Sequence, residues 1–159
     1  MERTNGREFA IVNDADIKRI IFRNIAGNPD RFHPDGCIGN FTLVLEDAKA
    51  EQLAALGYKV VHKEDRDGDM EARLKVNVRW DNYPPVISRV VEGEKKMVRM
   101  NQETVGCLDY DQIVCLDLKL NLSKNQATYL SEAIFVVARN EFADRYEGYE
   151  IESDEPVSF

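Results

Sequence analysis

The chain has 159 residues, of which 43% are hydrophobic and 31% are charged, a composition typical of one folded globular domain with its own core. No apolar run approaches the about 20 residues that span a bilayer, and the polar start lacks the apolar segment of a signal peptide. The formal net charge of −8 argues against a strongly basic module that binds phosphates over its whole surface. With three widely spaced cysteines, which suit reduced thiols, we expect a cytoplasmic protein.

The negative charge is concentrated at the C-terminus. Residues 146–159 contain no Lys or Arg and hold the acids Glu147, Glu150, Glu152, Asp154 and Glu155. These five account for most of the net charge and leave −3 for residues 1–145. Such a segment cannot bury enough apolar area to fold alone. We therefore divide the chain into an N-terminal arm (1–16), a body (17–145) and an acidic tail (146–159), and a local basic face on the body remains compatible with the charge.

In chain order, apolar alternation and turn residues predict mostly strands. Strands are predicted over residues 17–25, 38–45, 58–62, 70–80, 86–91, 96–100, 113–122 and 128–138, with a short strand at 8–13 as the alternative to a loose arm. The clearest helix covers residues 47–56, with Asp47 as its N-cap and Gly57 as its terminator. A helical turn is predicted within residues 101–109.

This succession of elements predicts a mostly β fold. Seven or so strands with one clear helix indicate a small barrel or sandwich. An OB-like antiparallel β-barrel with one or two short helices and an acidic C-terminal tail fits, because the helix is inserted between strands of a curved sheet. Periodicity does not separate this barrel from other β-barrels.

The strand predicted at 70–80 has one apolar face and one polar face. The polar face carries Arg73, Lys75, Asn77 and Arg79. Alternate residues of a strand lie about 7 Å apart, which is comparable with the spacing of phosphates in an extended nucleic-acid strand. The row is therefore a candidate phosphate track, and the alternative is the solvated outer face of an antiparallel sheet.

Aromatic side chains beside such a row could stack on bases. Phe22 shares a face with Lys18 if its strand is regular, Phe32 lies in a loop, and Tyr83 precedes Pro84. Core packing is the alternative for each ring, and it is the preferred interpretation for Trp80. The candidate DNA-binding residues are Lys18, Arg19, Phe22, Arg23, Arg31, Phe32, Arg73, Lys75, Arg79, Tyr83 and Arg89.

No sequence pattern indicates a metal site or catalysis. The acidic run Asp65–Asp69 resembles a calcium loop, but Met70 and Val76 stand where an EF-hand needs Gly and Glu. The histidines and cysteines lack zinc-site spacing, and no hydrolase motif is present. A divergent nuclease could use Asp109, Asp111 and Asp117, although surface acids are the preferred interpretation. We expect a non-enzymatic protein with no cofactor.

The chain ends with Asp154-Glu155-Pro156-Val157-Ser158-Phe159. This ending resembles the tail tip of bacterial and phage single-stranded-DNA-binding proteins, which is acidic and closes on Phe. Residues 17–138, notably Ile20 to Asn24, Phe41 and Gly57 to Val60, also resemble phage proteins assigned to that class. The resemblance implies that the tip, through Asp154, Glu155 and Phe159, recruits replication and recombination proteins and competes with DNA for the binding groove.

These observations together predict sequence-nonspecific binding of single-stranded DNA in replication, recombination or repair, within the host cytoplasm if the protein is phage-encoded. The expected partners are single-stranded DNA and proteins bound through the tail, without a membrane; a homo-oligomer is left open. Binding should weaken steeply with salt. The alternative is an acidic protein–protein adaptor or a DNA-mimic inhibitor of a host enzyme, which needs a broad negative face instead of a positive groove.

Overall fold

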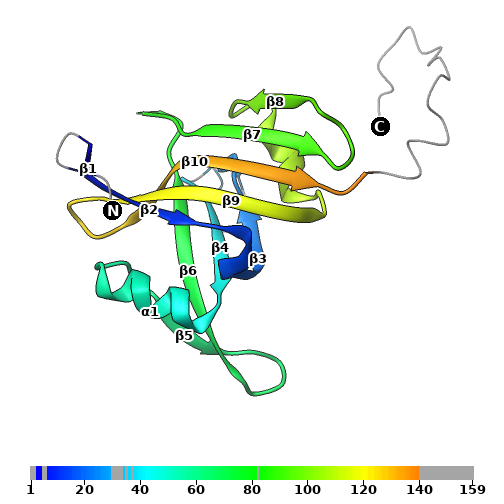
Figure 1. Cartoon of the computed structure of the whole chain (residues 1–159). Helices are drawn as coiled ribbons and strands as arrows, with labels where there is room; N and C mark the ends of the chain where they lie inside the picture. The colour runs from blue at the N-terminus through cyan, green and yellow to red at the C-terminus, as the bar shows by residue number, and fades with distance from the viewer. Residues whose placement is uncertain are drawn as a thin grey trace, which may run out of the picture.

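A computed structural model of the chain describes residues 3–4, 7–29, 34, 36, 38–81 and 83–139 (Figure 1). The candidates Arg31 and Phe32 and the whole acidic tail, residues 146–159, lie outside the described residues. Within the described part, no helix combines the length and the hydropathy that crossing a membrane requires.

The described chain is mostly strand, as predicted. The strands are β1 (Arg3–Thr4), β2 (Arg7–Val12), β3 (Ile17–Asn24), β4 (Gly39–Leu45), β5 (Val61–Glu64), β6 (Met70–Val78), β7 (Val86–Val91), β8 (Met97–Met100), β9 (Ile113–Leu122) and β10 (Thr128–Val137). The α-helix is α1 (Asp47–Ala55), and short 3₁₀ turns cover Asp14–Asp16 and Val105–Asp109. Because β2 pairs with β9, the sheet begins within the segment that the sequence suggested as an arm.

The strands form a curled sheet in the order β1-β2-β9-β10-β6-β4-β3, with β5 added to β6 and the β7–β8 pair added to β10. Strands β2, β9, β10 and β7 run across β6, β4 and β3, so the sheet folds over itself around one core (Figure 1). The mostly β, OB-like fold is confirmed. The sheet is not wholly antiparallel, because β10 runs parallel to both β6 and β7.

The long strand β6 is where the sheet turns. Its first residues pair with β5, while Asn77 near its end pairs with Tyr129 of β10. One edge of β6 therefore pairs with β5 along its first part and with β10 near its end. The alternation pattern of a single strand cannot reveal such a change of partner. The face of the sheet turned away from the core is called the outer face below.

Alternation along the strands builds the core. Leu74, Val76 and Val78 of β6 are fully or almost fully buried. Phe41 and Phe135 meet edge to face across the core, with ring centroids 6.4 Å apart. Trp80 packs against this core and donates an indole hydrogen bond to the carbonyl of Ile25 at 3.0 Å, as its core interpretation predicted.

The ends of helix α1 test two local predictions. The prediction that Asp47 is the N-cap is wrong: Glu46 holds that position, and Asp47 is the first helical residue, where its charge favours the helix dipole. Gly57 ends the helix as predicted, with φ of +101°. Hydrogen bonds from Gly57 N–H to the Ala54 carbonyl and from Tyr58 N–H to the Leu53 carbonyl, both 3.1 Å, complete a Schellman motif.

Candidate nucleic-acid interface

The outer face of β6 carries the predicted row of cations. Lys75 is exposed and Arg73 and Asn77 are half-buried, while the intervening residues point into the core. Arg79 follows the strand and is exposed. The structure thus separates the two faces as the alternation predicts, and it extends the outer face by one residue that the prediction left out, Glu71.

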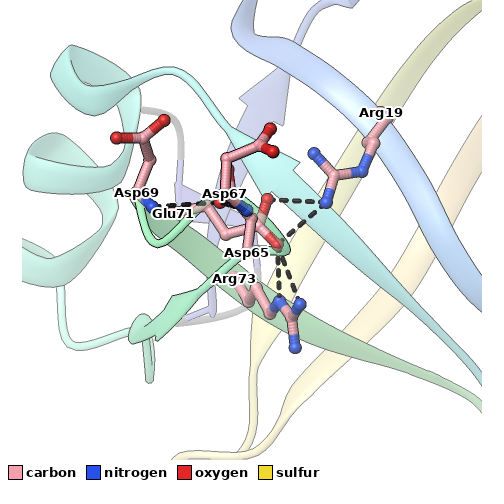
Figure 2. A network of polar contacts seen from close by, with 6 residues as sticks. All are labelled: Arg19, Asp65, Asp67, Asp69, Glu71 and Arg73. Carbon is pink, nitrogen blue, oxygen red and sulfur yellow. Dashed lines mark hydrogen bonds and ion pairs between the residues drawn. The ribbon is translucent and has the colours of Figure 1, made fainter.

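Glu71 is a nearly buried carboxylate at the start of this row, with only 4% of its surface exposed. Arg73 donates to its Oε1 at 2.8 Å, and Arg19 of β3 lies 2.7 Å from its Oε2 (Figure 2). The hydrogen bond from Arg73, and then that from Arg19, lowers the pKa of Glu71 below its ordinary value despite burial. Two predicted phosphate-binding arginines therefore share one carboxylate.

An open hollow of ≈ 680 Å³ adjoins this network. Its charged lining residues are Arg19, Arg66, Arg73, Glu64, Asp65, Asp67 and Glu71. The four acids outnumber the three cations, so the hollow is not an anion channel. The acidic loop is closed on itself, because Asp65 Oδ1 accepts from the N–H groups of Asp67 at 2.8 Å and Asp69 at 3.0 Å (Figure 2). Among described side chains, no group of three or more His, Cys, Asp or Glu is arranged to hold a metal ion.

Phe22 projects from the sheet beside this network. Phe22 is 66% exposed and its φ is +53°, a conformation that aromatic residues rarely adopt. The β3–β4 register is irregular between Ile21 and Asn24, and such irregularities re-aim side chains. The guanidinium of Arg73 lies 5.5 Å from the ring centroid, which places an exposed aromatic and a cation together.

The other end of the β6 row has a second aromatic–cation pair. Arg79 lies 6.0 Å from the ring centroid of Tyr129 on β10, and its Nη2 is 3.3 Å from Asp81. Within the described residues, Lys75 makes no ion pair. Lys75 is therefore the least neutralised cation of the predicted row.

Two other predicted cations lie away from this face. Arg23 donates to the carbonyls of Leu108 at 2.8 Å and Asp111 at 2.6 Å, and Arg89 Nε donates to the Asp111 carboxylate at 2.9 Å. Arg89 is also in register with the fully buried Phe135, so it is on the core side of the sheet. Both arginines fasten the 105–111 segment to the sheet.

The remaining described candidates are exposed but dispersed. Lys18 lies on β3 at a register irregularity between Ile17 and Arg19. Tyr83 is 79% exposed, with φ of +51°, in the connection from β6 to β7. The structure thus brings Arg19, Phe22 and Arg73 together, but it does not unite the nine described candidates into one surface.

Sequence reasoning missed an aromatic–cation pair farther along the outer face of the sheet, on β2 and β9. Lys119 of β9 lies 5.0 Å from the ring centroid of Phe9 on β2. Alternation in the predicted strands would have placed Lys119 and Tyr129 on the polar sides of β9 and β10. The sequence does not reveal the strand order, and it is the strand order that makes the polar sides of β9 and β10 continuous with the outer face of β6.

Rings and cations lie together on the outer face of this small, curled β domain, a combination that suits contact with a nucleic acid. The chain matches the family described as "Putative phage ssDNA-binding domain" over residues 6–151. It therefore belongs to this family of phage single-stranded-DNA-binding domains, which confirms the resemblance drawn from the sequence. No curated protein and no solved structure matches the chain.

Proposed function

We propose that this protein coats single-stranded DNA without sequence preference, through the outer face of the sheet centred on Lys75, and that it makes and breaks no bonds. The family match, which covers strands β2 to β10, carries this proposal. Exposed or half-buried rings beside cations supply what sequence-tolerant binding needs, since every base has a face for stacking and every nucleotide has a phosphate.

The cations of this face differ in how readily they can contact phosphate. Arg79 and Asp81 form an exposed ion pair, which contributes little stability and can exchange its carboxylate for a phosphate. Glu71 is nearly buried, so releasing Arg19 and Arg73 from it would leave an uncompensated carboxylate. Lys75 and Arg79 are therefore the first contacts with phosphate, while Arg73 orients Phe22. Lys18 and Tyr83 contact the DNA only if the bound DNA strand extends beyond the region around Lys75.

The acidic tail has a separate role in this proposal. A peptide with Asp154, Glu155 and a terminal Phe159 suits a partner pocket with basic walls and an apolar floor. Its charges steer association and its ring supplies the buried area. It would recruit replication, recombination or repair proteins to coated DNA.

Fluorescence anisotropy with labelled oligo-dT and a matched duplex, at two salt concentrations, tests DNA binding. We expect tight binding of oligo-dT, weak binding of duplex, and a loss of about tenfold or more on Lys75→Glu. Lys59→Glu, which reverses an exposed charge after α1, is the matched control and should bind as the wild type does. If the wild type binds neither nucleic acid, the proposal fails and the DNA-mimic alternative becomes the better one.

A further inference from the structure

Six residues from six different strands form one line across the outer face. The pairings are Phe9 with Asn121, Asn121 with Tyr129, Tyr129 with Asn77, Asn77 with Asn40, and Asn40 with Asn24. Residues in register on neighbouring strands share a face, and all six are half-buried, as expected for a sheet surface. We call this line the amide row.

The composition of the amide row suits bases better than phosphates. Its four asparagines carry both donors and acceptors, and its two aromatic rings offer faces for stacking. Not one of the six side chains is charged. Base edges need paired donors and acceptors, whereas phosphates need cations, so the row is matched to the base side of a nucleotide chain.

The cations lie beside the row. Lys119 lies over the Phe9 ring and Arg79 over the Tyr129 ring. Lys75 on β6 and Arg79 just after β6 are two residues to either side of Asn77, about 7 Å away along the chain. A chain whose bases lie on the row would therefore have its phosphates near these flanking cations.

The amides retain hydrogen-bonding capacity. Asn77 and Asn40 donate from Nδ2 to the backbone carbonyls of Thr128 at 3.2 Å and Ile38 at 2.9 Å, which orients each side chain and leaves its Oδ1 as an acceptor. Asn121 has no side-chain hydrogen bond to any part of the chain that the structure describes. Asn24 is bonded in both directions to Asn28, so it ends the row.

The Glu71 network disfavours the simpler path along β6. A backbone following β6 would meet the nearly buried Glu71 carboxylate, with which Arg19 and Arg73 are already paired. Across the strands, six positions at about 4.8 Å spacing give a track of about 24 Å. At about 6 Å per extended nucleotide, near twice the duplex rise of about 3.4 Å, the track holds about four nucleotides, within the range for one OB-like fold.

We infer that single-stranded DNA crosses the β-strands along the amide row, with its bases against the asparagines and rings and its phosphates toward Lys75, Arg79 and Lys119. This inference rests on the proposed function, because it specifies how the same ligand is held. It assigns base contact to Phe9, Asn121, Tyr129, Asn77 and Asn40.

Oligo-dT and an abasic oligomer of equal length separate base contacts from phosphate contacts. We expect the wild type to bind oligo-dT about tenfold or more tighter than the abasic strand. Asn121→Leu, which keeps the size and removes the amide, and Tyr129→Ala should each lose about tenfold on oligo-dT and leave abasic binding unchanged. The matched controls Gln52→Leu on α1 and Tyr110→Ala, where Tyr110 is 89% exposed outside the row, should bind as the wild type does.

Side-chain NH₂ resonances of the unaltered protein provide a readout that does not depend on variants folding. Those of Asn40, Asn77 and Asn121 should shift with oligo-dT and stay in place with the abasic strand. The amide row is overturned if the wild type binds both strands equally, or if the row variants keep wild-type affinity while Lys75→Glu loses it; the proposed function then stands. If the wild type binds no oligo-dT, the proposed function itself fails.

Discussion

Glu71 and Arg73 lie two residues apart on β6, and their side chains form a 2.8 Å ion pair on the outer face. The same carboxylate also holds Arg19 of β3, two strands away from β6 in the sheet. Two guanidiniums around one carboxylate leave a single net positive charge. Arg73 holds that charge beside the Phe22 ring. The ion-pair trio of Arg19, Glu71 and Arg73 therefore positions an exposed aromatic side chain and is not a free phosphate site.

This ion-pair trio makes the free energy of unfolding depend on pH in the acidic range. The folded protein holds the pKa of Glu71 below its ordinary value of 4.5, chiefly through the hydrogen bond from Arg73, so the unfolded chain takes up the proton more readily. The stabilisation is complete above pH 4.5 and is lost as the pH falls through the lower, folded-state pKa. We expect Glu71→Gln to narrow the difference in unfolding free energy between about pH 7 and about pH 3, measured by urea denaturation.

The control for this acid dependence is Glu51→Gln, which changes an exposed carboxylate of α1 and should keep the wild-type difference. An unchanged pH dependence in Glu71→Gln would show that the two arginines do not stabilise the ionised carboxylate in solution.

The positive φ of Phe22 predicts a separation of stability from binding. Phe22→Gly and Phe22→Ala both remove the ring, but only glycine relieves the left-handed backbone. We expect Phe22→Gly to exceed Phe22→Ala in unfolding free energy by about 1 kcal/mol, while both bind oligo-dT about fivefold or more weakly than the wild type. Urea denaturation and anisotropy titration measure the two effects. Equal stability of the two variants would mean that the backbone at this position is not left-handed in solution.

The contrast between β6 and the amide row explains what sequence reasoning can reach. Alternation in residues 70–80 placed Lys75 and Asn77 on one face, because a strand's own period decides that. It could not supply Glu71's second partner, since Arg19 is 52 residues away. Nor could it align Asn121 and Tyr129 with Asn77, because only strand order and register set those neighbours. Local periodicity therefore predicted the strands and their faces, whereas the neighbours within the site are set by long-range strand pairing, which periodicity does not contain.

The ion pairs also change the salt dependence expected from the sequence. If Lys75, Arg79 and Lys119 are the cations that meet phosphates, three neutralised charges give a slope of about −2 for log K against log salt concentration on single strands. Anisotropy titrations with oligo-dT at several salt concentrations measure the slope, and Lys75→Glu should make it shallower. A wild-type slope of about −3.5, the value for five neutralised charges, would show that Arg19 and Arg73 leave Glu71 for the DNA after all.

The acidic tail should weaken binding through charge alone. Removing residues 147–159 takes away five carboxylates and changes the net charge from −8 to −3. We expect the truncated protein to bind oligo-dT several-fold tighter at about 0.01 M salt, where charges act over about 30 Å, and equally at about 1 M salt, where they act over about 3 Å. Phe159→Ala in the full chain keeps every carboxylate, so it should bind oligo-dT as the wild type does. Tighter binding by Phe159→Ala, equal to that of the truncation, would instead mean that the terminal ring occupies the DNA site, because no charge would have changed.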